Sequence, residues 1–427
     1  MGLFFAIPYR RLRLSSVGQV FDKRFASRRC QWLTSLCVQT EYLVVNIIEP
    51  FVIGSIISGV TGWPFGITVF IGGFVILIFT AMGGLKGTAI TNIIHCSVTI
   101  FGLALVGMFA MSDMGGWDSL QAQANTALIE AGMDQKSWWS FTGIGWITII
   151  ALFFSATLHT PAASVYANYA SSAKAEKMLI PGFLLAGALA AVMPFFAGLI
   201  GVEAFAKYGA ESGLSSYRNI TQLATDTGPI IGGVALAAIL AALISSGAPM
   251  LLGGATMFVN DWIPGSKNFS EKKRLKAYKL TAVFYGLLAT VIAWQGDISS
   301  VLQLLLLGFA MVVPPAIAIA YMFYWKKTSE FAAFYGILSG YATGLVHWSL
   351  NSLFDDSAYA TAGGFGQFWH ESQLALGEWS DPTFSATLIP LLVIPLLTLL
   401  RPANDEDSEM SQTFYRTIKN KDGLQTA

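Results

Sequence analysis

Residues 180–202 read IPGFLLAGALAAVMPFFAGLIGV and contain no charged side chain. Three other stretches of similar length, 65–82, 301–324 and 384–400, are also free of charge. About 20 apolar residues in a helix cross the hydrocarbon layer of a bilayer, so we interpret these stretches as membrane spans. The alternative is a large soluble helical protein, but its long segments would show polar faces at helical spacing, and these stretches do not.

The whole composition agrees with this interpretation. Hydrophobic residues make up 54% of the chain and charged residues 12%, about half the charged fraction of a soluble domain. Hydropathy along the chain predicts ten spans, at residues 31–58, 64–84, 89–112, 146–166, 178–204, 229–257, 278–295, 298–325, 331–352 and 383–400.

Basic residues are distributed unequally between the predicted loops, although the 25 basic and 25 acidic residues cancel in net charge. All of the lysines and arginines except Lys136, Lys207 and Arg218 lie in loops on one side of the ten-span topology. Basic loops mark the cytoplasmic side. We therefore expect a multi-pass protein of the cell (plasma or inner) membrane with both ends of this chain in the cytoplasm.

Several other classes of protein are disfavoured. The three cysteines, Cys30, Cys37 and Cys96, are too scattered for a disulfide framework, and the N-terminal residues lack the order of a signal peptide. The sequence shows no nucleotide-binding loop, no zinc-spaced His/Cys cluster and no Gly-x-Ser-x-Gly element. We expect no enzyme activity, no prosthetic group and no nucleic-acid partner.

Three stretches, taken together and in this order, resemble the sodium:solute symporter family. Residues 82–92 (MGGLKGTAITN) resemble its glycine-rich inner turn. Residues 238–246 (AILAALISS), followed by Asn260-Asp261-Trp262, resemble its small-residue helix with paired hydroxyls and a later aspartate. Residues 324–328 (YWKKT) resemble its aromatic and basic exit from a span.

The resemblance implies an all-α membrane fold of the LeuT type, in which ten core helices form two inverted repeats of five. The expected divisions are a basic cytoplasmic segment at 1–30, the remaining first-repeat helices at 31–112, an extracellular loop at 113–145, the second repeat at 146–325, two additional helices at 326–400 with an outer loop at 353–382, and a cytoplasmic tail at 401–427. The first repeat is incomplete, because its first two helices have no counterpart.

A cation site is predicted within 229–257. Ser245 and Ser246 place two hydroxyl oxygens at mid-span, and Pro249 lacks the N–H that would bond the Ser245 carbonyl. The family resemblance implies that sodium binds Ser245, Ser246 and the carbonyl of Ala242. The alternative is that both serines simply bond back to carbonyls of their own helix.

A solute site is predicted in span 146–166, where Pro161 and neighbouring hydroxyls mark a possible break in the helix. Its candidate residues are Thr157, His159, Thr160 and Ser164. A histidine that is packed and bonded within the bundle is the alternative for His159. Ala167-Asn168 stands where the family usually has Gln-Arg, which argues against assigning a sugar or proline.

Two further positions bear on coupling. Asn92 stands where the family has an aspartate, and we assign it a coupling role. Glu49 lies near mid-span before Pro50, and intramembrane carboxylates usually line a cavity or pair with a cation. We expect Glu49 to bind a cationic group of the solute or to exchange a proton; the alternative is a structural carboxyl, which we prefer for Glu41.

These features predict a secondary active transporter that couples the movement of sodium to that of a small organic solute across the lipid bilayer. Sodium would be a coupling ion and not a prosthetic group. The alternatives are a membrane sensor or interaction subunit with a transporter fold, and a proton-coupled transporter of a related LeuT-fold family. We also expect that residues 1–427 alone do not carry out coupled transport, and that a longer chain, or a partner, supplies the missing N-terminal helices.

Overall fold

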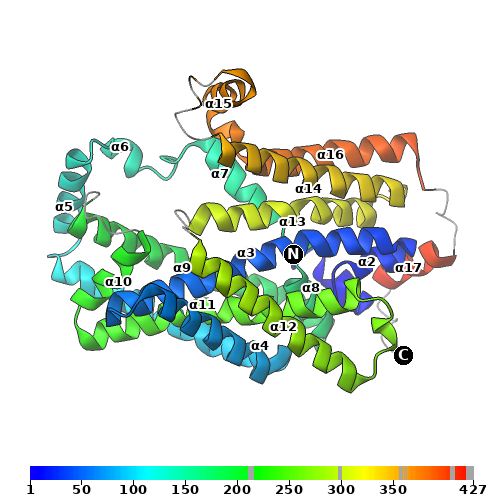
Figure 1. Ribbon diagram of the computed structural model, residues 1–427, viewed down its shortest axis with the longest axis horizontal. Helices are drawn as coiled ribbons and strands as arrows, with labels where there is room; N and C mark the ends of the chain where they lie inside the picture. The colour runs from blue at the N-terminus through cyan, green and yellow to red at the C-terminus, as the bar shows by residue number, and fades with distance from the viewer. Residues whose placement is uncertain are drawn as a thin grey trace.

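The computed structural model describes residues 1–209, 216–296, 301–354, 359, 361, 363–403 and 409–419, with the backbone alone at 82–86, 88 and 216–219. Throughout this part of the chain the regular elements are helices (Figure 1). Seven of the described helices are long and apolar enough to cross a membrane, and 65–81 and 146–158 are shorter apolar helices. The fold is therefore the predicted all-α, multi-pass membrane class.

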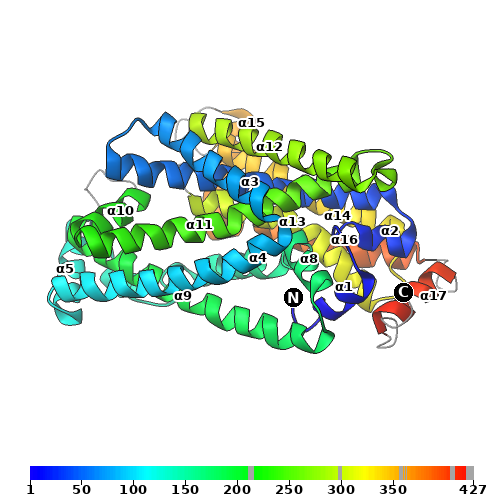
Figure 2. The same cartoon turned by 90° about the horizontal axis from the view of Figure 1, so that it is seen from below.

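Helix α3 (Arg28–Thr61) runs through the middle of the bundle (Figures 1 and 2). It begins where the Ser27 side chain accepts a hydrogen bond from the Cys30 N–H, and it ends at Gly62, whose φ is +70°. The predicted span 31–58 thus lies inside a longer helix. Much of α3 is buried by other helices, including the polar side chains of Glu41 and Glu49.

Helix α4 (Phe65–Asp113) is assigned as one helix, where the sequence predicted two spans joined by a turn at 82–92. Its 49 residues would be about 70 Å long if straight, more than twice the thickness of a bilayer core. Its two ends instead lie on the same side of the molecule. Gly59, just before the start of α4, lies beside Thr221 of the short helix α10 (Ser216–Asp226). Ala110, near the end of α4, packs in a cluster with Leu223 of the same short helix. The two predicted spans are therefore present, joined by a bend that stays helical (Figure 2).

The predicted span 146–166 is discontinuous. Helix α7 (Trp146–Phe153) passes into a π-turn (Phe154–Leu158), and after a non-helical stretch the chain resumes as α8 (Ser164–Ser172). Two tyrosines hold the break in place: the Tyr9 hydroxyl donates to the Pro161 carbonyl at 2.5 Å, and the Tyr42 hydroxyl accepts from the Val165 N–H at 2.8 Å.

The remaining long helices follow the predicted spans closely. They are α9 (Leu179–Tyr208), α11 (Pro229–Met257), α12 (Glu271–Gln295), α13 (Val301–Tyr324), α14 (Glu330–Leu353) and α16 (Pro382–Leu400). Helix α12 starts earlier than the predicted span 278–295 because Ser270 caps its first turn, so Lys272, Lys273 and Arg274 lie on a helix rather than in a loop. Helix α9 exposes apolar side chains such as Leu185 and Phe195, as lipid contact requires.

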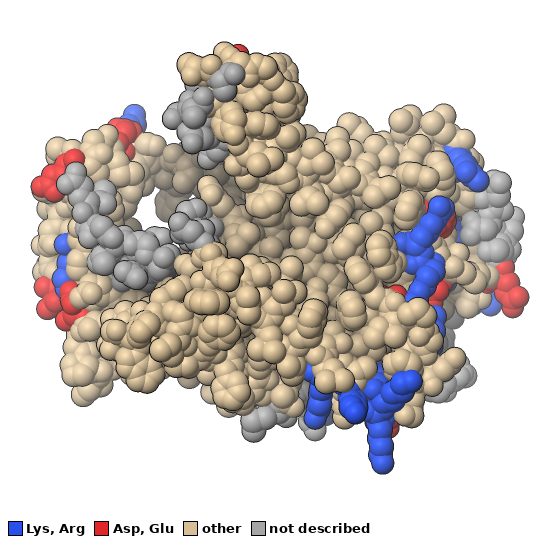
Figure 3. Space-filling model, in the orientation of Figure 1, with Lys and Arg blue, Asp and Glu red and all other residues tan. Residues whose placement is uncertain are grey.

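The two loops predicted at 113–145 and 353–382 contain helices of their own. The first holds α5 (Trp117–Glu130) and α6 (Gln135–Trp138). A further short helix, α10 (Ser216–Asp226), packs against α3 and α11. The second holds α15 (Gly364–Leu376) and a 3-10 turn (Gly377–Ser380). Figure 3 shows basic side chains gathered at the opposite end of the molecule, with an uncharged band between the two ends.

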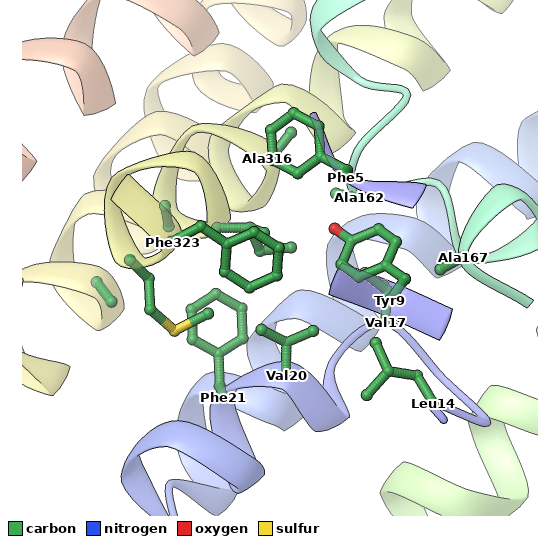
Figure 4. Packing of buried hydrophobic residues seen from close by; sticks show 14 of the residues in the cluster. Phe5, Tyr9, Leu14, Val17, Val20, Phe21, Ala162, Ala167, Ala316 and Phe323 are labelled. Carbon is green, nitrogen blue, oxygen red and sulfur yellow. The ribbon is translucent and has the colours of Figure 1, made fainter. Parts of the chain in front are cut away.

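The basic end is closed by short helices from both ends of the chain. Helices α1 (Ala6–Leu12) and α2 (Gln19–Phe25) pack with α17 (Glu409–Lys419) against the end of α13. Phe5, Tyr9 and Phe21 surround Phe323 of α13 in this cluster (Figure 4). Residues 1–30, predicted from their charge to be a basic segment, thus also contribute a substantial part of the apolar core.

Candidate cation and solute sites

Small residues bring α11 close to α4 and α3. A Cβ at Gly102 of α4 would lie 2.4 Å from Cβ of Ala238, so only glycine allows this approach. The Thr99 hydroxyl donates to the Ala238 carbonyl at 3.1 Å at the same contact. Close packing through small residues is how helices associate in a membrane, where no water is left to expel.

Ser245 and Ser246 lie on α11 at the level of Glu49. The Ser245 hydroxyl donates to the Ala242 carbonyl at 2.7 Å, which is the local bonding expected for a helical serine. The Ser246 hydroxyl lies 3.3 Å from the same carbonyl but only 2.5 Å from Oε1 of Glu49. Three of the residues assigned from the sequence, Ala242, Ser245 and Ser246, therefore share one group of oxygens with a carboxyl from α3.

The Ser245 carbonyl, which lacks its helical hydrogen bond because residue 249 is a proline, accepts a hydrogen bond from another helix. Nδ2 of Asn92, on α4, donates to the Ser245 carbonyl at 3.1 Å. Asn92 and Ser245 are far apart in sequence, and the coupling role assigned to Asn92 did not include this contact. The amide of Asn92 uses one of the two lone pairs of the carbonyl oxygen, so the other lone pair can still act as a ligand.

Glu49 approaches α11 at a glycine, Gly247. A Cβ at Gly247 would lie 1.6 Å from Oε2 of Glu49, so the absence of a side chain makes room for the carboxyl. Glu49 is 2% exposed, and its Oε2 has no hydrogen-bond partner among the described residues. A buried carboxyl oxygen without a partner is costly, and it is the feature of this site most clearly suited to a cation.

The break at Pro161 repeats the chemistry seen at Pro249. Pro161 has no N–H for the Thr157 carbonyl four residues earlier, and the Thr160 hydroxyl donates to that carbonyl at 2.9 Å. His159, 4% exposed, lies beside the break with its Nδ1 at 2.7 Å from the Ser155 carbonyl. The sequence therefore located the discontinuity correctly.

The structure does not bring all the candidate solute residues together. Thr157 is exposed, whereas Ser164 is fully buried and its hydroxyl accepts from the Val17 N–H at 3.2 Å, on the side of the short N-terminal helices. His159 instead lies near Glu41, with 3.9 Å between its Nε2 and Oε1 of the carboxyl. Of the four hydroxyl and imidazole candidates, His159 and Thr160 are the ones placed at the break.

A cavity of about 240 Å³ lies between α8, the second half of the broken helix, and α11. Val165 and Asn168 of α8 line one side, Pro249 and Gly253 of α11 another, and Tyr278 of α12 a third. Asn168 is the residue at which the sequence departs from the family's Gln-Arg pair. The cavity therefore connects the proline of the cation site with the helix predicted to bind solute.

Two features were missed from the sequence. Asp261, quoted only as a motif residue, is fully buried in the π-turn that ends α11, where its Oδ1 accepts from Ser16 Oγ at 2.8 Å and Gln31 Nε2 at 2.7 Å. Gly247, which makes room for the Glu49 carboxyl, was not among the candidate residues. No group of three His, Cys, Asp or Glu residues suited to a transition metal occurs in the described part of the chain.

Comparisons with known proteins bear on the family and the fold. The family model described as "Sodium:solute symporter family" matches residues 1–340. The sodium/proline symporter of Staphylococcus aureus is 24% identical over 301 residues, which cover 67% of this chain and 56% of that protein, and the protein of strain Newman matches equally. The chain thus spans little more than half the length of these relatives.

The fold is similar to a solved structure of a Na⁺-coupled sialic acid symporter in a substrate-bound, outward-open state. The TM-score is 0.71 and the identity 18%, with 94% of this chain and 81% of the other covered. At this identity the likeness concerns the fold, and it agrees with the LeuT-like helix bundle expected from the sequence.

Proposed function

Because this chain belongs to the sodium:solute symporter family, we propose that the protein containing it couples the movement of sodium to that of a small organic solute across the cell membrane. The basic, closed end of the bundle would face the cytoplasm, together with residues 1–30 and 401–427. Residues 146–325 would form the second inverted repeat, and the membrane part would have no enzymatic role.

One observation carries the sodium proposal: Ser246 and Glu49 meet at a point where α11 has a carbonyl freed by Pro249. Sodium, as a hard cation, requires several oxygen ligands once it loses water, and helix irregularities supply them within membranes. The hydroxyls of Ser245 and Ser246 and the Ala242 carbonyl would bind the ion. Glu49 adds a negative charge, which the family assignment from the sequence did not include in the cation site.

The solute would bind at the break between α7 and α8, next to the cavity that Pro249 lines. His159 and Thr160 are the two candidates that border the break, and Thr157 and Ser164 would act only indirectly. Proline and sialic acid are the solutes named for similar proteins. Asn168, which faces the cavity, differs from the family pattern, so we propose a small polar solute of another kind.

The test uses Ser246→Ala in the full-length protein. Unfolding is monitored in detergent at equal concentrations of sodium chloride and choline chloride. We expect the variant to require at least about tenfold more sodium for the same stabilisation, because loss of one ligand costs about 1.4 kcal/mol of binding. The matched control is Ser339→Ala, which removes a serine that bonds back to Gly336 in α14, away from the site.

An unchanged sodium response in Ser246→Ala would refute the assignment of the serines. A parent protein that shows no sodium response at all, but a response to pH, would instead favour the proton-coupled alternative. A parent that responds to neither ion but binds another protein would favour the sensor or interaction subunit.

A further inference from the structure

A second polar pair lies about two turns along α3 from Glu49: one member, His159, is a solute candidate, but the contact between the two side chains has no assigned role. Glu41 is 1% exposed, and its Oε2 has no hydrogen-bond partner among the described residues. Oε1 lies 3.9 Å from Nε2 of His159. Both side chains are closed off from solvent, so each must find its charge balance within the protein.

The tautomer of His159 is determined by its other ring nitrogen. Nδ1 lies 2.7 Å from the Ser155 carbonyl, which can only accept, so Nδ1 carries a hydrogen. In a neutral ring, Nε2 then carries a lone pair. This lone pair faces a carboxyl oxygen, and two acceptors next to each other repel unless a proton lies on one of them.

The number of protons on the pair follows from charge. With no proton, the pair buries an isolated negative charge, and with two protons it buries an isolated positive charge; each is costly in a low-dielectric surrounding. With one proton, the pair is either His⁺ with Glu⁻ or neutral His with protonated Glu, and its net charge is zero. One proton is therefore the favoured content of this pair.

The other groups around the pair do not provide a replacement for that proton. Tyr42 on α3 and Tyr166 on α8 are the other titratable groups within electrostatic reach of Glu41, with Tyr169 next to them, and all three are neutral phenols. On α13, Gly308 lies directly against Glu41 and Phe309 stacks on the His159 ring at 4.3 Å. A stacked aromatic ring also favours the protonated imidazole.

We infer that Glu41 and His159 form a proton-binding site between α3 and the break of the discontinuous helix. The bound proton stabilises the arrangement in which the break lies against α3, because separating the two side chains would leave one of them charged or unpaired. Proton binding therefore favours this conformation of the helix over one in which it has moved away. The inference does not depend on the sodium assignment.

The test measures the protonation of both groups in the full-length protein reconstituted in phosphatidylcholine vesicles. The chain has four histidines, so ¹⁵N-histidine labelling gives few ring signals, and His159→Gln assigns the one of interest. Infrared difference spectra of the parent and Glu41→Gln identify the carboxyl band. Across pH 6 to 8 we expect either a doubly protonated His159 ring or a protonated Glu41 carboxyl.

The variants give the second readout. If the proton of the parent pair lies on the His159 ring, Glu41→Gln removes the carboxylate that stabilises the imidazolium, and the proton affinity of the ring should fall at least about tenfold, one pH unit in its titration. If the proton lies on Glu41, the amide replaces a neutral carboxyl, so the protonated-carboxyl band should disappear while His159 stays neutral. Glu203→Gln is the matched control, because Glu203 is also a fully buried carboxyl on a spanning helix, and it should leave His159 unchanged. An ionised Glu41 beside a neutral His159 would overturn the inference, and so would a doubly protonated His159 whose titration is the same in Glu41→Gln. Neither readout requires sodium or transport, so a failed sodium proposal would leave it standing.

Discussion

Glu49 and Asp261 are both acidic residues removed from water, the first packed against the helix segment 229–262 and the second part of it, but their surroundings differ. Asp261 receives hydrogen bonds from Ser16 and Gln31 and lies within electrostatic reach of Arg28. Glu49 receives one, from Ser246, and forms no ion pair with any described basic side chain. Equal burial therefore does not imply an equal role: the first region is a fixed structural contact, and the second has capacity for another ligand.

The largest expected effect breaks the structural contact. Asp261→Ala leaves the Ser16 hydroxyl and the Gln31 amide, both fully buried, without their acceptor. Each unpaired buried group costs about 1–3 kcal/mol, so unfolding in detergent should occur at lower denaturant, with a loss of about 2–5 kcal/mol. The sodium response should persist in the protein that remains folded. A loss below about 1 kcal/mol would show that Asp261 is not a structural contact.

The second prediction tests how closely Glu49 is held. Gly247→Ala introduces a Cβ where Oε2 of Glu49 lies, and this overpacking should cost about 1–3 kcal/mol. Gly233→Ala is the control on the same helix, because its Cβ would meet nothing within 4 Å. Adding Glu49→Ala should recover much of the loss in a double-mutant cycle measured by thermal unfolding. Additive losses would mean that the two positions do not touch.

A third prediction concerns the freed carbonyl of Ser245. In Asn92→Asp a carboxylate would face that carbonyl, so the protein should lose about 1 kcal/mol in choline chloride and show a larger stabilisation by sodium. Gln39→Glu provides the comparison, since Gln39 donates to the Gly254 carbonyl further along α11 at 3.0 Å. It should be destabilised without gaining sodium dependence. Equal sodium responses in both variants would separate Asn92 from the cation site.

The smallest effect lies at the end of α10, at Asp226. The Tyr208 hydroxyl, followed by Gln222 and Lys207, stabilises the Asp226 carboxylate and lowers its pKa from the usual 3.8. A lowered pKa in the folded state adds stability above pH 4, and this is lost as the pH falls through the folded value. Because Asp226 is exposed, Asp226→Asn should cost less than about 1 kcal/mol at pH 7, and this cost should shrink as the pH falls below 3.8 in thermal unfolding. A cost that is independent of pH would exclude the carboxylate as its source.

The parts of the fold that could be predicted are those that depend on neighbouring residues. The length of an apolar run defines a span, and the missing N–H of Pro249 or Pro161 frees a carbonyl wherever the helix lies. The residues that then occupy such carbonyls could be predicted only when local: Thr160 is three residues from Thr157, whereas Asn92 and Ser245 are 153 apart.

The sites show the same limit. The serine pair was assigned to sodium from the family resemblance, but its contact Glu49 is 197 residues away, and nothing in the sequence associates the two. Glu41 was interpreted as structural because it lies nearer the end of its span. Its proximity to His159 arises from the position of the break against α3, which Tyr9 and Tyr42 determine through tertiary contacts. The sequence therefore predicts which residues have functional chemistry, but not which residues from distant parts of the chain they contact.

The contact between Glu49 and Gly247 also has an evolutionary consequence. A side chain at position 247 is tolerated more readily where position 49 already has a shorter residue, because otherwise the Glu49 carboxyl must move to make room for it. The order of substitutions is thus biased: loss of the carboxyl first makes the change of the glycine less costly. Among descendants of a common ancestor, the two positions should therefore be inherited as a unit, although almost two hundred residues of sequence separate them.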